Sequence, residues 1–325
     1  MSTAVKAFFV AVCLSVSCGM LYAQNAQNFP VRPVRIIVPA TPGNPSDIIA
    51  RIIGIKLSEY WGQPVVFENR PGAGGTLGTA YAAKAAPDGY TLLIAVGAFI
   101  TNAALQSNLP YDSINDFSGV AQLGYPASAL VVSPTLGFKN IPDLVAFGKA
   151  QPGKLLFGSA GAGGGSHLQG ERVRLAAGVK AVHVGFRGQP EALIEVLTAR
   201  VHFMVSTFGA AYPLIKDGRL LALGVTTPQR LPQLPDVPAL GEMLPEFKRP
   251  ETTNAFLAPA RTPRAILERI SKDVARSLES PDVVKKLNTI AYIILPSTPE
   301  EADKIRRAQI EALTKLAIAS GLRAK

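Results

Sequence analysis

Short apolar segments alternate with helical segments along almost the whole chain, and this alternation restricts the fold more than any other feature. Apolar runs of strand length occur at 34–39, 65–68, 91–96, 129–132, 155–158, 181–184, 203–205, 220–225 and 254–258. Helical patterns lie between several of them, for example at 48–57, 141–149 and 166–177. Buried strands that alternate with helices predict parallel sheets with crossover helices, and therefore an α/β fold.

The length of the chain predicts two lobes. Its 325 residues, 48% of them hydrophobic and 17% charged, exceed the usual size of one domain. Two amphipathic helices, at about 263–278 and 299–318, close the chain and need a sheet to cover. We therefore expect lobe 1 to comprise 24–127 and 250–325 and lobe 2 to comprise 128–249. The crossings then fall near 126–128 and 248–252, with a ligand cleft between the lobes.

Residues 1–23 have the three-part pattern of a secretory signal peptide. Lys6 precedes an apolar run at 7–16, and a small-residue stretch ends at Ala23. Both cysteines, Cys13 and Cys18, lie in this segment, so the mature chain contains no thiol. A disulfide framework, a cysteine zinc site, a thiolate nucleophile and an iron–sulfur cluster are thereby excluded. A lipid anchor at Cys18 and a retained signal anchor are the alternatives to a cleaved signal.

The positive charge of the chain is spread along the sequence. The net charge is +10, and loss of Lys6 with the signal, which contains no acid, leaves +9. No block of five basic residues occurs, and aromatic residues make up only 7% of the chain, so the pattern is not that of a nucleic-acid binder. A diffuse positive surface instead favours a small anionic ligand.

Two polar loops follow apolar strands and precede helices. The first is 40–47, and the second is the glycine-rich segment 158–167. In open α/β sheets such loops place the free amides of helix N-termini beside a ligand. The second loop lacks the Gly-Lys-Ser/Thr of a Walker motif and the spacing of a dinucleotide fingerprint. Helix capping in the first loop and a plain flexible turn in the second are the competing interpretations.

The sequence contains no recognisable catalytic motif. The three histidines, His167, His183 and His202, form neither an H-E-x-x-H nor an H-x-H pattern, and no serine lies in a G-x-S-x-G setting. We therefore expect no enzymatic activity, no metal and no cofactor.

The chain resembles the periplasmic solute receptors of the tripartite tricarboxylate transporter type, often called Bug receptors. The resemblance rests on segments 33–39, 62–66, 68–75, 86–93, 109–112, 158–159, 166–168, 182–184 and 234–238, together with Pro42, Gly43 and Asp47. It implies a two-lobed clamshell in which each lobe is a mixed, mainly parallel sheet flanked by helices. It also implies a monomeric periplasmic receptor that closes on a small carboxylate and delivers it to a membrane permease.

The same resemblance implies a set of ligand-binding residues. The first loop supplies Thr41, Gly43, Asn44, Ser46 and Asp47, and the second supplies Gly161, Ala162, Ser166 and His167. Arg187 is a candidate partner for a second carboxylate, and a solvated surface arginine is the competing interpretation. Ser206 and Thr207 stand where the family often carries an aspartate, which disfavours a ligand with an amino group.

Two other functions fit the same sequence. A clamshell can report ligand binding to a membrane sensor instead of a permease, and one sequence does not separate these outputs. An exported hydrolase is the remaining alternative, with Ser166 as its candidate nucleophile.

Overall fold

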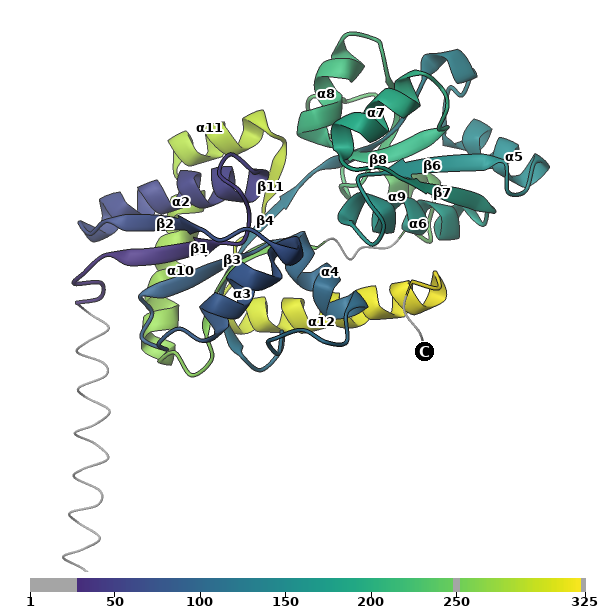
Figure 1. The fold of residues 1–325 in the computed structure, drawn as a ribbon. Helices are drawn as coiled ribbons and strands as arrows, with labels where there is room; N and C mark the ends of the chain where they lie inside the picture. The colour runs from purple at the N-terminus through teal and green to yellow at the C-terminus, as the bar shows by residue number, and fades with distance from the viewer. Residues whose placement is uncertain (1–27, 248–251, 323–325) are drawn as a thin grey trace, which may run out of the picture.

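The computed structural model describes residues 28–247 and 252–322, and within this range the strands form two sheets (Figure 1). The first sheet has the spatial order β11 (Tyr292–Ile294), β4 (Phe117–Pro126), β10 (Asn254–Pro259), β3 (Thr91–Ala95), β1 (Val34–Val38) and β2 (Val65–Asn69). The second sheet has the order β7 (Ala181–Gly185), β6 (Leu155–Ser159), β8 (Phe203–Thr207), β5 (Ser128–Val132) and β9 (Leu221–Val225). We call each sheet with its helices the first unit and the second unit.

Helices flank both sheets. Those of the first unit are α2 (Pro45–Trp61), α3 (Thr76–Ala83), α4 (Gly97–Leu105), α10 (Arg264–Leu278), α11 (Pro281–Thr289) and α12 (Pro299–Ala319), with the short 3-10 helix η1 (Ala73–Gly75). Those of the second unit are α5 (Ile141–Ala150), α6 (Gly165–Ala177), α7 (Gln189–Leu197), α8 (Phe208–Lys216) and α9 (Leu240–Met243), with η2 (Pro134–Leu136). The expected α/β architecture, with two mixed sheets flanked by helices, is confirmed.

Strand β1 shows how the first sheet obtains a core on each face. Val34, Ile36 and Val38 belong to one buried cluster, and Ile37 belongs to another. This division follows from the two-residue period of a strand, which sends successive side chains to opposite faces. Helix α10 covers the first cluster through Ile266, Ile270, Val274 and Leu278, which recur every fourth residue along one side of the helix.

The expectation that the sheets are mainly parallel is wrong in detail. In the described residues the parallel pairs are β1–β2, β1–β3, β6–β7 and β6–β8, and the other five pairings are antiparallel. The reason is the path of the chain. Strand β5 carries the chain into the second sheet and β10 brings it back into the first, so each runs against its neighbours.

The first connection between the sheets has almost no linker. Strand β4 leads through Ala127 directly into β5, within the predicted crossing at 126–128. The Ala127 N–H donates to the Ala291 carbonyl at 3.0 Å, and the Ala127 carbonyl accepts from Phe208 N–H at 2.8 Å. The second predicted crossing at 248–252 lies almost wholly outside the described residues, as do the predicted signal peptide and residues 24–27 of lobe 1. The lobe boundaries therefore stay a prediction.

No helix within the described ranges is both long enough and apolar enough to cross a membrane.

Candidate functional site

The predicted first loop connects β1 to α2 and is held by its own polar side chains. Asn44 is the N-cap of α2, because its Oδ1 accepts from Ser46 N–H at 3.1 Å. Asp47 accepts from Gly43 N–H and Arg51 Nε, both at 2.9 Å, and from Asn69 Nδ2 at 3.0 Å. Burial raises the pKa of Asp47, but these hydrogen bonds outweigh it and keep the pKa below its usual value. Both Ser46 and Asp47 are buried in the base of the loop.

The predicted glycine-rich loop connects β6 to α6 and is also closed on itself. Ser166 Oγ accepts from Ala160 N–H at 3.0 Å, and His167 Nδ1 accepts from Gly163 N–H at 2.8 Å. The first helical hydrogen bond of α6 runs from Leu168 N–H to the Gly164 carbonyl. The backbone N–H groups of the first turn therefore have no acceptor within the helix and remain available to a ligand. The Ser166 hydroxyl hydrogen is available as well, since the bond to Ala160 uses only its oxygen.

Two stacked histidines lie beneath this loop. The rings of His167 and His183 are 3.5 Å apart between centroids and 12° from parallel. His183 Nε2 lies 2.7 Å from Ser159 Oγ, which also accepts from Gly161 N–H. Burial lowers the pKa of both histidines, and Glu171 opposes the shift in each. For His167, burial and the neighbouring His183 together lower the pKa to about 4. Both rings are therefore neutral near pH 7, and His167 carries its proton on Nε2 because Nδ1 accepts.

A cavity of about 330 Å³ lies between the two units. The first unit and the segments joining the units contribute Gly97, Thr101, Tyr125, Pro126, Thr252, Asn254 and Leu313. The second unit contributes Ser128, Ala160, Gly165, Ser166, Leu168, Gln169, Arg172, Gln189, Val205, Thr207 and Thr226. A volume of this size suits a small organic molecule.

The electrostatics of this cavity favour an anion. Helices α4, α6 and α7 begin at its wall with Gly97, Gly165 and Gln189, so three helix N-termini contribute partial positive charge. Arg172 adds a full positive charge from α6. None of the described lining residues is an aspartate or a glutamate.

Gln189 organises the wall formed by the second unit. Its Nε2 donates to Ser206 Oγ at 2.9 Å and to Thr207 Oγ1 at 2.7 Å. Ser206 has no exposed surface and donates its own hydrogen to the Thr207 carbonyl. The two hydroxyls at the end of β8 are thus fixed by one amide at the start of α7.

The structure brings only part of the predicted set together. Ser166 and Thr207 line the cavity, and Gly161, Ala162, His167 and Ser206 lie in or next to the segments that form its wall. Thr41, Gly43, Asn44, Ser46 and Asp47 do not line it. Arg187 is exposed, lies outside the lining, and offers its backbone N–H to Glu191 Oε2 at 3.0 Å.

The sequence interpretation missed several lining residues, above all Gly97, Arg172 and Gln189. Gly97 had a usable signal, because it comes two residues after the end of the buried strand Thr91–Ala95, and ligand sites lie at such strand ends. Gln189 gave no motif signal, since its role depends on hydroxyls 17 and 18 residues away.

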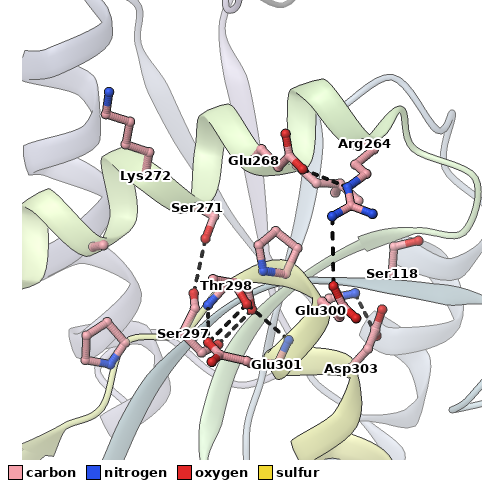
Figure 2. A pocket seen from close by; sticks show the side chains of 15 residues that line it. Ser118, Arg264, Glu268, Ser271, Lys272, Ser297, Thr298, Glu300, Glu301 and Asp303 are labelled. Carbon is pink, nitrogen blue, oxygen red and sulfur yellow. Dashed lines mark hydrogen bonds and ion pairs between the residues drawn. The ribbon is translucent and has the colours of Figure 1, made fainter.

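A larger cavity of about 860 Å³ lies on the first unit, between α10 and the start of α12 (Figure 2). Its lining is taken from the first unit and carries four carboxylates, Glu268, Glu300, Glu301 and Asp303. Glu268 pairs with Arg264 at 2.7 Å, and Glu301 forms a capping box with Thr298. These acids would repel an anion, so this cavity is not the candidate site. No cluster of three potential metal-ligating side chains occurs in the described part of the chain.

Comparisons with known proteins point to one group of proteins. The family model described as "Tripartite tricarboxylate transporter family receptor" matches residues 49–314. Protein BugT of Bordetella pertussis is 31% identical to this chain over 299 residues, which cover 90% of this chain and 91% of BugT.

Two solved structures are similar along nearly the whole chain. R. palustris Rpa4515 with adipate is 30% identical with a TM-score of 0.77, and the match covers 90% of this chain and 98% of that one. MatC (Rpa3494) from Rhodopseudomonas palustris with bound malate is 29% identical with a TM-score of 0.71, and the match covers 89% and 99%.

Proposed function

Since the chain belongs to the tripartite tricarboxylate transporter receptor family, as its motifs predict, we propose that it captures a small carboxylate in the cavity between its two units. The members of this family are solute-binding receptors. The protein acts in the periplasm after loss of its signal peptide. It delivers the bound acid to the permease subunits of a membrane transporter.

The observation that carries this proposal is the charge of the cavity wall. Three helix N-termini and Arg172 face a space whose described lining contains no carboxylate. A carboxylate that enters loses hydration, and the backbone N–H groups of α6, the Ser166 hydroxyl and the helix dipoles replace that hydration. The similar proteins solved with adipate and with malate hold dicarboxylic acids, which agrees with this chemistry.

The proposed mechanism is closure of two lobes. Lobe 1 comprises 24–127 and 250–325, and lobe 2 comprises 128–249, in accordance with the division between the sheets. The ligand first binds Ser166, Thr207 and the loop that contains Gly161, Ala162 and His167. Closure then brings Thr41, Gly43 and Asn44 toward the ligand, while Ser46 and Asp47 hold their loop in shape. Arg187, which is exposed, contacts a second carboxylate only in the closed form, and the receptor works as a monomer.

Binding without turnover fits the placement of the histidines. The closest approach of a serine hydroxyl to a histidine in the described residues is Ser159 Oγ to His183 Nε2, and Ser159 has no exposed surface. Ser166 faces the cavity, but its hydrogen-bond partner is a backbone amide, which cannot act as a base. We therefore assign the protein no catalytic residue.

Isothermal titration tests the proposal directly. The mature protein is titrated with mono-, di- and tricarboxylates and aromatic acids, and each binder is compared with its methyl ester. We expect binding of at least one acid with Kd below about 1 mM, and loss of that binding in the uncharged ester. Ser166→Ala should weaken binding by about 1–3 kcal/mol, because the carboxylate loses a hydroxyl donor.

Two outcomes would contradict the proposal. The first is the absence of any carboxylate binder from the panel, confirmed by a mass spectrum of protein purified from its native host that releases no acid. The second is equal affinity for acid and ester. Turnover of generic esters that disappears in Ser166→Ala would instead support a hydrolase.

A further inference from the structure

We infer that Gln189 determines ligand specificity by selecting a carboxylate that bears a neutral hydroxyl group over one that bears an ammonium group. This inference rests on the proposed function, and it concerns the wall of the cavity that Gln189 forms with Ser206 and Thr207.

The orientation of the Gln189 amide follows from the hydrogen of Ser206. Ser206 Oγ donates its single hydrogen to the Thr207 carbonyl at 3.2 Å, so it must accept from Gln189. The group that lies 2.9 Å from Ser206 Oγ is therefore the Nε2 of Gln189. Because both Nε2 hydrogens are used, one for each hydroxyl, Gln189 offers the cavity its carbonyl Oε1 as an acceptor.

Thr207 complements this acceptor with a donor. Its Oγ1 accepts from Gln189 at 2.7 Å, and no described group accepts its own hydrogen. Both Gln189 and Thr207 line the cavity, so an acceptor and a donor stand side by side on one wall. A hydroxyl group both donates and accepts, and it satisfies the two at once.

An ammonium group fits the same wall poorly. It has no lone pair to accept the hydrogen of Thr207. It also brings a positive charge into a space that already contains Arg172 and three helix N-termini, and that has no carboxylate in its described lining. A methylene group neither donates nor accepts, and it leaves both wall groups without a partner.

Matched ligand series test the inference. Succinate, malate and aspartate differ only in carrying hydrogen, hydroxyl or ammonium on one carbon, and glutarate, 2-hydroxyglutarate and glutamate repeat the comparison one carbon longer. In whichever of the two series binds, we expect the wild type to bind the hydroxy acid at least about tenfold more tightly than the amino acid. A tenfold ratio of affinities is about what one neutral hydrogen bond supplies.

Two variants of Gln189 separate its role from simple packing. Gln189→Glu keeps the volume, accepts from both hydroxyls and adds a negative charge, so it should reverse the hydroxyl-to-ammonium ratio. Gln189→Met keeps the length and removes the polar group, so it should abolish the preference for the hydroxy acid. Gln151→Glu, at the exposed end of α5, adds the same charge outside the cavity and should leave the ratio unchanged. Thermal unfolding of each variant verifies that it is folded.

The outcomes distinguish this inference from the proposed function. If carboxylates bind but the ratio stays within about twofold in Gln189→Glu and Gln189→Met, the inference is wrong and the receptor function stands. The same conclusion follows if the wild type binds acids but prefers the ammonium-bearing member. If no carboxylate binds the wild type at all, the proposed function fails and this inference fails with it.

Discussion

His167 couples the glycine-rich loop to the interior of the second unit. Its Nδ1 accepts from Gly163 N–H, and its ring stacks on His183. Glu171 lies on the same helix with its Oε1 3.9 Å from His167 Nε2, and Glu171 is itself paired with Arg174. A proton on Nδ1 would break the hydrogen bond from Gly163 N–H, and the two N–H groups would then repel each other at the base of the loop. The neutral ring is therefore the form that supports the loop.

This arrangement predicts that the protein loses stability in mild acid. The pKa of His167 is about 4 in the folded protein and about 6.5 in the unfolded chain, so the unfolded chain binds more protons between these values. The stabilising contribution is complete above pH 6.5 and declines as the pH falls toward 4. Urea unfolding measures the free energy of unfolding at pH 7 and at pH 4.5. Between these two pH values, this free energy should fall by about 2 kcal/mol more in the wild type than in His167→Asn, whose amide oxygen still accepts from Gly163.

His202→Asn is the matched control for this prediction. Burial also lowers the pKa of His202, whose Nδ1 accepts from Leu156 N–H away from the glycine-rich loop. Its substitution should reduce the acid sensitivity of stability but leave ligand affinity unchanged, whereas His167→Asn should alter both. Parallel pH profiles for the wild type and His167→Asn would show that His167 does not titrate in this range.

At the scale of single elements, the sequence predicts best where packing is periodic and one-sided. The apolar residues of α10 recur every fourth position, and its predicted range of 263–278 matches the observed Arg264–Leu278 within one residue. Strands such as Thr91–Ala95 are continuous apolar runs because helices cover both faces of the sheet. Such patterns can be recognised from the sequence because they depend only on residues that are close together in the chain.

Elements whose environment is set by distant segments escaped prediction. Strand β4 contains Gly119 and Gly124 and has no apolar periodicity, yet it lies inside the first sheet, between β11 and β10. Glycine is needed at 119 because a Cβ there would lie 2.7 Å from the Pro299 carbonyl oxygen. The sequence analysis also missed helices α4 and α11 and strand β11. Because α4 begins at Gly97, that lining residue was missed as well. The sequence predicted the site residues that lie in or near loops with glycine and serine motifs. It did not predict those that only the folded chain brings to the cavity.

On helix α12, we expect substitution of Arg306 to have a large effect on the stability of the protein. This side chain is 2% exposed and donates to the carbonyls of Ser113, Ile114 and Phe117 at 2.6, 3.3 and 3.1 Å, and it also pairs with Asp303. These hydrogen bonds connect the segment 113–117, which leads into β4, to α12. Arg306→Met should lower the free energy of unfolding by about 3–5 kcal/mol, because three carbonyls lose this donor and the Asp303 carboxylate loses its cationic partner. Urea unfolding at pH 7 measures the difference.

The adjacent Arg307 provides a control on the same helix. It is exposed, so Arg307→Met should change the free energy of unfolding by no more than about 0.5 kcal/mol. Arg306→Lys should fall between the two, because an ammonium retains the charge but reaches fewer of the carbonyls. Equal effects of Arg306→Met and Arg307→Met would mean that the buried contacts contribute little.

At the scale of the whole molecule, the two units share a buried apolar contact as well as a cavity. Leu168 lies on α6 of the second unit, is 3% exposed, and belongs to a cluster otherwise built from the first unit, including Ala104 and Leu313. Helix α12, which carries Leu313, extends past the first sheet toward α6 (Figure 1). This contact holds the units together beside the ligand cavity, so we expect it to keep the units partly closed even without ligand, and closure over the ligand proceeds from that arrangement.

Leu168→Ala tests this coupling between the units. The substitution removes apolar contact between the units worth about 2–4 kcal/mol, so the ligand-free protein should open and its radius of gyration in solution scattering should increase. Ligand affinity should fall by about tenfold, because binding must then supply the energy of closure. Leu193→Ala removes the same atoms from a cluster built mainly from the second unit and should lower stability without either effect. An unchanged radius of gyration and affinity in Leu168→Ala would show that the units stay closed, or stay open, independently of this contact.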